Sequence, residues 1–370
     1  MVVITMVSTT ACGGGSHDPS AMTPVIERLL ADRPAPSTDQ VEIWICRVPT
    51  DTTAAIYGRL PLRLDLDPAT VAAQLAAPVG DYFRNISAGR YSVSMAAGGV
   101  IELGVDETDA DCVARAVRQA STDASVVLAV ANAEHVAGEP GGRGTSGTWP
   151  TCVDVCTVAH TGRAAYVGAS DFSPDWGPVP LLDLIEHELG HTLGLPHSGL
   201  GGPSGVDYLS ALDLMSNSAS PRDVNPSTLD GPDLIAIDRV DLGWLPLTDT
   251  VLGATGTVTV TLAPSTGPSG TRLLVLPVDE HRVVTVELLT PTGYNAHLPE
   301  AGIAVHLVDD STGTGIDRTQ QPLVGEPPFT ELLSAGERLT THGWTITVTA
   351  LDAAAGSATA AEVAARRTDG

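Results

Sequence analysis

Alternating apolar and polar positions predict strands in the first half of the chain, and a helical period appears twice among them. Residues 41–46 alternate and are β-rich, and residues 125–130 form a buried apolar run. Residues 67–86 open with Asp-Pro, a favourable helix start, and then keep an approximate helical spacing. Residues 109–124 predict a second helix. Strands and helices that alternate in this way are typical of a layered α/β domain.

Weaker patterns complete this region. Short strands are predicted at residues 90–95 and 100–103, and an edge strand at 164–169. Pro78 should kink the first helix, because proline removes a helical hydrogen bond. The Gly-rich stretch 138–163 holds two cysteines and predicts a long loop pinned by a disulfide.

From about residue 251 the pattern changes to short β-rich runs separated by turn residues, which predicts a small antiparallel β-sandwich. The runs lie at 256–262, 271–276, 282–288, 302–307 and 343–349, with one more strand in the Ala-rich tail after 353. We therefore expect an α+β chain. A twisted mixed sheet with helices would span residues 41–250, and the sandwich would span 251–370.

Composition narrows the classes of function. The 370 residues suffice for two domains, and 43% hydrophobic residues suffice for a sizeable core. Lys and Arg total 19 against 44 acidic residues, which gives a net charge of −25. This composition argues against nucleic-acid binding, because phosphate recognition needs clustered Lys and Arg side chains. No run reaches the roughly 18 apolar residues that a membrane-spanning helix needs.

The N-terminus resembles the end of a bacterial lipoprotein signal peptide. Residues 1–12 form a short apolar stretch that ends in small residues and Cys12, and residues 13–40 read as a flexible tether. Lipidated Cys12 would then be the membrane contact of an exported protein anchored in the cell envelope. A secreted protein and a cytoplasmic start with a chance cysteine are the alternatives.

Four cysteines remain after Cys12, namely Cys46, Cys112, Cys152 and Cys156. An even number in an exported chain predicts two disulfides, and four cysteines allow three pairings. We favour Cys46 with Cys112 and Cys152 with Cys156. A cysteine metal site is the less favoured alternative, because the Cys152–Cys156 spacing has no second matching pair.

The chemistry is concentrated in the segment HELGHTLGLPH, residues 187–197. His187 and His191 are four residues apart, so both imidazoles lie on one face of a helix and can reach one zinc ion. Gly194 is placed to end that helix, so that the chain can return His197 as a third ligand. Three protein ligands leave one position open for water, and Glu188 is placed to act as the general base.

These residues resemble the zinc motif of the metzincin clan of peptidases. A second match is Asp213-Leu-Met215-Ser216, which resembles the Met-turn beneath the zinc in that clan and follows His197 by eighteen residues. Fragments at 82–91, 208–215, 241–246 and 293–305 are similar to gametolysin-like and immune-inhibitor-A-like bacterial peptidases. The resemblance implies a metzincin-like zinc peptidase domain. Some metzincins place an oxyanion-stabilising tyrosine two residues after the methionine, where this chain has Asn217.

Other polar residues near these motifs have ordinary interpretations. Glu186 could accept a hydrogen bond from a zinc-bound histidine, but a solvated helix position is the favoured reading. The acids at 106, 107, 109 and 111 could bind calcium, but their spacing lacks the loop glycine of a calcium motif. They are better explained as acids at a helix N-terminus. Calcium therefore has no support from the sequence.

The sequence as a whole predicts an extracellular metalloendopeptidase that uses one zinc ion. A zinc-activated water would hydrolyse peptide bonds of a protein or peptide substrate, with Glu188 as general base. The alternative is a cell-surface adhesion lipoprotein in which the zinc site is structural. Zinc-dependent hydrolysis of a non-peptide amide is a third possibility.

Overall fold

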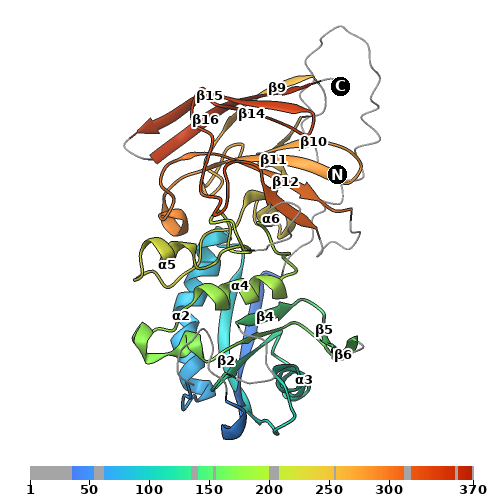
Figure 1. Ribbon diagram of the computed structural model, residues 1–370, viewed down its shortest axis with the longest axis vertical. Coiled ribbons are helices and arrows are strands. Elements are labelled where there is room, and N and C mark those ends of the chain that lie inside the picture. Colours follow the sequence, from blue (N-terminus) through green and yellow to red (C-terminus); the bar gives the residue numbers. More distant parts are fainter. Residues whose placement is uncertain are drawn as a thin grey trace. The chain divides into compact units, whose positions relative to one another are not determined.

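The computed structural model describes residues 36–53, 62–134, 141–152, 156–199, 208–253, 256–311, 318–354 and 357–368 (Figure 1). Within 148–160 and 353–357 only the backbone is described. The predicted signal peptide with Cys12, and nearly all of the tether, lie outside the described residues. The predicted domain boundaries at residues 12, 40 and 250 stay predictions.

The chain forms two compact units. The first, here called the N-terminal unit, comprises Ala35–Leu195 and Pro226–Gly231. The second, the C-terminal unit, contains Pro196–Asn225 and Pro232–Gly370. The fold is thus mixed α+β with several sheets, as expected at this coarse level.

The N-terminal unit is built on a five-stranded mixed sheet of order β2-β1-β3-β7-β4. Its strands are β1 (Thr38–Arg47), β2 (Ser92–Glu102), β3 (Val126–Ala131), β4 (Gly142–Thr145) and β7 (Ala164–Val167). All neighbours pair in parallel except β4, which is antiparallel to β7. The two short strands expected at 90–95 and 100–103 form the single strand β2. The strand expected at 164–169 is present as β7, but its expected place at the edge of the sheet was wrong, because β4 pairs with its outer side.

Two helices in this unit accompany the sheet, α2 (Pro68–Ile86) and α3 (Asp109–Gln119). Helix α2 begins as predicted, because the Asp67 side chain accepts a hydrogen bond of 2.9 Å from the backbone N–H of Thr70. Pro78 lies inside α2. Figure 1 shows α2 and α3 on opposite sides of the strands. Trp44 and Cys46 share a core cluster with α3, so Ile45 between them faces the other side of the sheet.

The first predicted disulfide is confirmed. Cys46 on β1 is bonded to Cys112 on α3, and both side chains are fully buried. Cys152 and Cys156 stand opposite one another in the antiparallel pair β5 (Thr148–Cys152) and β6 (Cys156–Thr161). Their side chains are outside the described atoms, so the second disulfide stays a prediction. The expected loop 138–163 therefore contains three short strands, β4, β5 and β6.

The remaining elements of the N-terminal unit are short, apart from the helix of the histidine motif. They are η2 (Thr50–Thr52), η3 (Ser170–Phe172), η4 (Pro174–Trp176) and α4 (Asp183–Thr192). Helix α4 lies against β4 and β7. The motif is therefore positioned beside the antiparallel edge of the sheet.

The C-terminal unit holds two sheets with a common core, which agrees with the predicted sandwich. One sheet has the order β13-β12-β11-β10-β8 and the other β14-β15-β16-β9. The strands are β8 (Thr250–Leu252), β9 (Thr257–Leu262), β10 (Leu273–Pro277), β11 (Arg282–Leu289), β12 (Gly302–Asp309), β13 (Thr319–Pro322), β14 (Arg338–Thr341), β15 (Trp344–Ala354) and β16 (Ser357–Arg367). Leu276 and Val286 from one sheet share a core cluster with Ile346 and Val363 from the other.

One strand pair departs from the expected antiparallel pattern. Strand β8 runs parallel to β10. The chain crosses from β8 to β9 in the other sheet before it returns as β10, so the two neighbours run in the same direction. In β9 the side chains alternate between exposed and buried, as the sequence pattern predicted.

Short helices complete the C-terminal unit. They are α5 (Ser220–Val224), α6 (Ala236–Asp241), η6 (Leu247–Asp249) and η7 (Gly293–Asn295). Ile237 and Val240 of α6 share a buried cluster with Leu273, Val283 and Val308 of the first sheet. None of the helices in the described ranges is both long and apolar enough to cross a bilayer.

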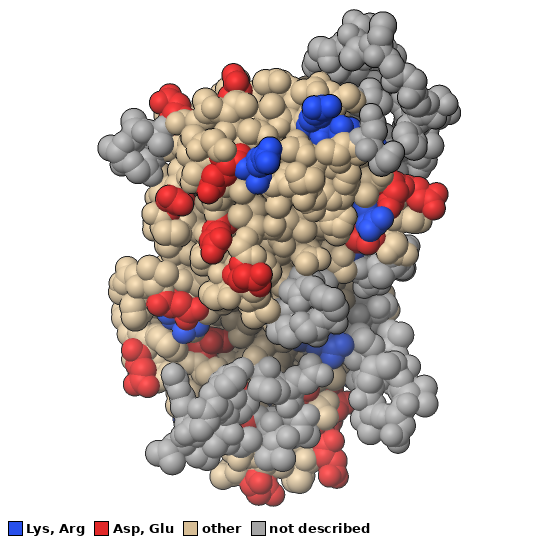
Figure 2. All heavy atoms as spheres, turned by 45° about the horizontal axis from the view of Figure 1, so that its top comes forward, with Lys and Arg blue, Asp and Glu red and all other residues tan. Residues whose placement is uncertain are grey.

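Figure 2 shows acidic side chains spread over one face with few arginines among them.

Candidate metal centre

The structure brings the three predicted histidine ligands together. His187 and His191 lie on α4 with their Nε2 atoms 3.1 Å apart. The ligand nitrogens of His187, His191 and His197 all lie within 4.8 Å of one another. His187 is buried, and the other two are half-buried. In the part of the chain that the structure describes, this is the single convergent group of three or more possible metal ligands.

The end of α4 explains how the chain turns toward His197. Helix α4 stops at Thr192, and Gly194 adopts φ of 92°, which an L side chain rarely tolerates. The N–H of Gly194 donates to the His191 carbonyl at 3.0 Å, and the N–H of Leu195 donates to the Gly190 carbonyl at 3.3 Å. These bonds satisfy helix carbonyls in a left-handed cap. The predicted helix stop at Gly194 is confirmed.

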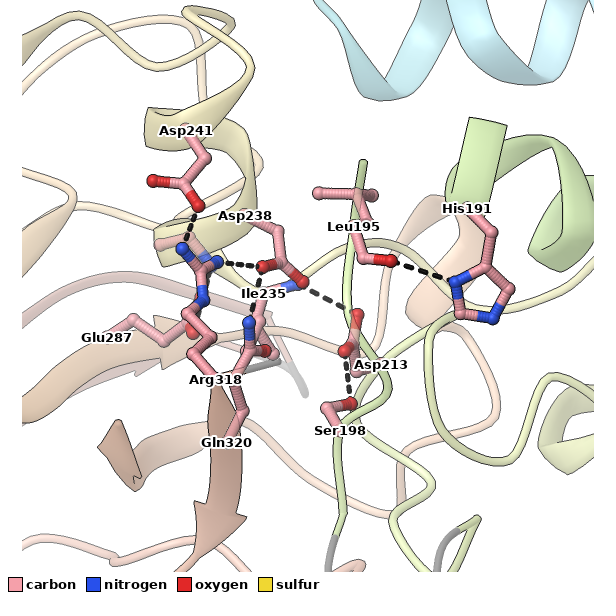
Figure 3. Close-up of polar contacts among 11 residues, drawn as sticks. His191, Leu195, Ser198, Asp213, Ile235, Asp238, Asp241, Glu287, Arg318 and Gln320 are labelled. Atoms are coloured by element: carbon pink, nitrogen blue, oxygen red, sulfur yellow. Dashed lines mark hydrogen bonds and ion pairs between the residues drawn. The ribbon is translucent and has the colours of Figure 1, made fainter. Parts of the chain in front are cut away.

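A backbone carbonyl orients the second histidine. Nδ1 of His191 lies 2.8 Å from the carbonyl oxygen of Leu195 (Figure 3). A carbonyl can only accept, so Nδ1 carries the proton and Nε2 keeps a lone pair. Histidines that bind a metal through one ring nitrogen usually donate a hydrogen bond from the other nitrogen, often to a backbone carbonyl.

The residue after the third histidine is bound to the Met215 turn. The N–H of Ser198 donates to the Met215 carbonyl at 2.9 Å, and the Ser198 hydroxyl donates to the Asp213 carboxylate. Asp213 also accepts the backbone N–H of Ile235 at 3.2 Å. Met215 itself is fully buried. The segment that resembles a Met-turn therefore holds the chain that follows His197.

Asp213 belongs to a buried polar network in the C-terminal unit (Figure 3). Burial, and next the charge of Asp238, raise the pKa of Asp213 well above its usual value. Asp238 accepts hydrogen bonds of 2.5 Å from Arg318 and 2.6 Å from Gln320, and Arg318 also binds Asp241. Arg318 therefore neutralises part of the negative charge of this group of carboxyls.

Glu188 is the predicted general base, and its environment suits that role. The side chain is buried, and its Oε2 atom has no hydrogen-bond partner among the described atoms. Burial raises the pKa of the carboxyl well above its usual value, and the charge of Asp171 raises it further, whereas Arg143 lowers it. A carboxylate with a raised pKa is a stronger base at neutral pH.

Strand β4 approaches the motif closely because it carries glycine. A Cβ added to Gly142 would lie 2.5 Å from Oε1 of Glu188. A Cβ added to Gly144 would overlap the backbone carbonyl oxygen of Glu188. The two glycines thus let the edge strand lie directly against Glu188.

Tyr208 contacts one of the three histidines, a role that no sequence pattern indicated. Its hydroxyl lies 2.9 Å from Nε2 of His197. The sequence marked Tyr208 only as part of a spacing shared with related peptidases, and no pattern indicated contact with a ligand. Asn217, at the position where some metzincins have tyrosine, instead donates its backbone N–H to the Ser210 carbonyl at 3.0 Å.

Glu186 differs from its favoured interpretation as a solvated helix residue. It is fully buried, and its Oε2 atom accepts the N–H of Gly231 at 2.9 Å. Burial, and next the charges of Asp230 and Asp183, raise the pKa of this carboxyl. Glu186 faces the interior because the segment 226–231 covers this side of α4. The acids Asp109 and Asp111 do lie in the first turn of α3, as expected of helix N-terminal acids.

Comparisons with known proteins do not identify a family for this chain. No family model and no curated protein matches the chain. Among solved structures, a matching chain from "Structure of a chaperone-substrate complex" is 17% identical, with a TM-score of 0.26. The match covers 57% of this chain and 36% of that chain, so this protein spans about a third of its length. A likeness this weak supports no argument, and the conclusion that stands is a histidine triad that could bind a metal ion.

Proposed function

We propose that this protein is an extracellular zinc-dependent metalloendopeptidase of metzincin type. The convergence of His187, His191 and His197 is the observation that supports the proposal most directly. Three imidazoles without a carboxylate suit a first-row transition metal such as zinc, and three ligands leave a position open. The mixed sheet beside α4 fits the fold that the sequence resemblance implied.

The chain's own residues have distinct roles in the proposed reaction. Zinc supplies Lewis acidity when bound, because it polarises a carbonyl and lowers the pKa of water. Glu188 takes a proton from the water that attacks the peptide carbonyl carbon, and then delivers that proton to the leaving amine nitrogen. The carbon–oxygen bond forms first, and the carbon–nitrogen bond breaks afterwards, when the nitrogen has received the proton from Glu188 and leaves as the amine. The unpartnered Oε2 of Glu188 supports this assignment.

Export is the second part of the proposal. The buried Cys46–Cys112 disulfide supports it, because disulfides persist in oxidising compartments. Lipidated Cys12 would anchor the chain to the envelope, and release of the protein into the medium would instead indicate an ordinary secreted protein. Fractionation of cells that express the unsubstituted chain and Cys12→Ala separates these two outcomes.

Cleavage of a proteome-derived peptide mixture tests the activity. The zinc-loaded protein, Glu188→Ala and the exposed-site control Glu102→Ala are compared, with metal content measured in each. Loss of the base should lower the cleavage rate at least about 100-fold, with one zinc per chain retained. Glu102 is exposed, so its variant should cut normally.

Three results would contradict the proposal in different ways. Equal cleavage by the Glu188→Ala variant would remove the assigned base. Zinc binding without cleavage by any variant would favour the surface-adhesion alternative with a structural metal. Cleavage of amide-linked cell-wall fragments alone would favour the non-peptide amide alternative.

A further inference from the structure

The C-terminal end of α4 leaves carbonyl groups without helical partners, and the structure shows which groups satisfy them. The Gly190 and His191 carbonyls accept N–H groups of the Gly194 turn, and the Leu189 carbonyl accepts the Thr192 hydroxyl at 2.7 Å. The carbonyl of Thr192 accepts Nε–H of Arg163 at 2.8 Å. A side chain from just before β7 thus completes the end of the helix that carries two proposed ligands.

Arg163 is itself held rigidly. Its two terminal nitrogens each donate a 2.7 Å hydrogen bond to one oxygen of the Asp39 carboxylate, a parallel fork. The Asp39 side chain is fully buried, and the Arg163 side chain is 20% exposed. The hydroxyl of Tyr91 donates to the same carboxylate at 2.7 Å.

The charge of Asp39 is maintained although the group is buried. Burial raises the pKa of its carboxyl, but hydrogen bonds from Arg163, Tyr91 and Ser125 outweigh burial and lower it overall. A cation at a helix C-terminus also interacts favourably with the helix dipole. Arg163 therefore connects a charged anchor on β1 to the last turn of α4.

The link from Asp39 through Arg163 to Thr192 ends next to one of the proposed metal ligands. Thr192 directly follows His191, and the turn that begins there carries the Leu195 carbonyl. That carbonyl holds Nδ1 of His191 at 2.8 Å. Movement of the turn would therefore move the acceptor that sets the orientation of the His191 ring.

We propose that Arg163 is a positioning residue that fixes the C-terminal turn of α4 and so presets His191 for metal binding. The inference rests on the proposed function, because it takes the histidine triad as the metal site. Arginine is required rather than any cation, since only its planar group can bind Asp39 through two nitrogens and Thr192 through the third.

Zinc affinity measured by chelator competition tests the proposal, together with hydrogen exchange of the amides of residues 192–195 in the zinc-free protein. Arg163→Gln should weaken zinc binding about 10- to 100-fold, as loss of an orienting partner does. The same amides should exchange at least about tenfold faster. Arg163→Lys keeps the charge but not the fork, so its affinity should be intermediate.

Arg272 offers a matched control in the C-terminal unit. It also joins a carboxylate to a backbone carbonyl: Nε and one terminal nitrogen donate to one oxygen of Asp249, the other terminal nitrogen donates to the Gly267 carbonyl, and only 6% of the side chain is exposed. Arg272→Gln should lower stability as much as Arg163→Gln and leave zinc affinity unchanged. If Arg163→Gln does not fold, Asp39→Asn takes its place, with zinc affinity expected to fall at least about threefold.

The two measurements, zinc affinity and hydrogen exchange, distinguish a failure of this inference from a failure of the proposed function. Unchanged zinc affinity in Arg163→Gln, or an equal loss in Arg272→Gln, would overturn the positioning role. An unsubstituted chain that binds no zinc would overturn the proposed function, while exchange at residues 192–195 would still decide whether Arg163 holds the turn. Unchanged exchange there would overturn the inference by itself.

Discussion

The hydroxyl of Tyr208 lies 2.9 Å from Nε2 of His197, and the two rings meet edge-on with centroids 4.8 Å apart. Tyr208 has φ of 67°, an uncommon conformation for a residue other than glycine. Its side chain is well exposed, so the phenol stands where substrate can reach it. A phenol beside a ligand nitrogen is close to any metal that this nitrogen binds.

We expect Tyr208→Phe to lower kcat of peptide cleavage by about 10- to 100-fold, because a hydrogen-bond donor to developing oxyanion charge is lost. KM and zinc affinity should change by less than about threefold, since the three imidazoles remain. Steady-state kinetics and chelator competition measure both. A loss confined to zinc affinity would instead assign Tyr208 to metal retention.

Gly144→Ala should disturb the contact between β4 and α4. The added methyl group would overlap the Glu188 backbone carbonyl, which cannot rotate away as a side chain can. Overpacking of this kind costs about 1–3 kcal/mol of unfolding free energy. Gly147→Ala is the matched control, because no atom lies within 4 Å of its added Cβ. Equal thermal unfolding of the two variants would contradict the prediction.

Removal of the Cys46–Cys112 disulfide should destabilise the N-terminal unit. The bond closes a loop with a sequence separation of 66 residues. The chain-entropy model predicts a loss of about 4 kcal/mol for a loop of this length. Denaturant unfolding of the Cys46→Ala/Cys112→Ala protein, beside the unsubstituted protein with and without reductant, measures the loss. Unfolding free energies within about 1 kcal/mol of each other would contradict the prediction.

Stability should fall as pH rises, in part through Glu287. Burial raises the pKa of its carboxyl to about 7, although hydrogen bonds from Ala236 and Ser265 and the charge of Arg239 lower it. The folded chain therefore holds this proton more tightly than the unfolded chain. The stabilisation is fully present at pH values below the pKa of this carboxyl in the unfolded chain. It is lost as pH rises through the folded-state pKa of about 7.

The Glu287 contribution amounts to about 3 kcal/mol between pH 4 and pH 8. Urea unfolding across that range measures it. Glu287→Gln should flatten the pH dependence, although buried Asp213 and Asp238, whose pKa values are also raised, act in the same direction. An unchanged slope in Glu287→Gln, with Glu102→Gln as the exposed control, would show that Glu287 does not titrate in this range.

Several features of the fold followed from local patterns. Asp67 and Pro68 open α2 because the cap needs only residues within one turn. Gly194 ends α4 for the same reason. Strand β4 escaped prediction because Gly142 and Gly144 place backbone, not apolar side chains, against α4, so no hydrophobic alternation marks the strand.

The sequence by itself determined the histidine triad and the helix that presents it, because ligands four residues apart share a helix face whatever surrounds them. Tertiary structure alone decided that Glu186 is buried, that Tyr208 meets His197, and that Arg163 reaches Asp39 and Thr192. Arg163 and Asp39 are 124 residues apart. Contacts over such separations depend on strand order and register, which no short stretch of sequence contains.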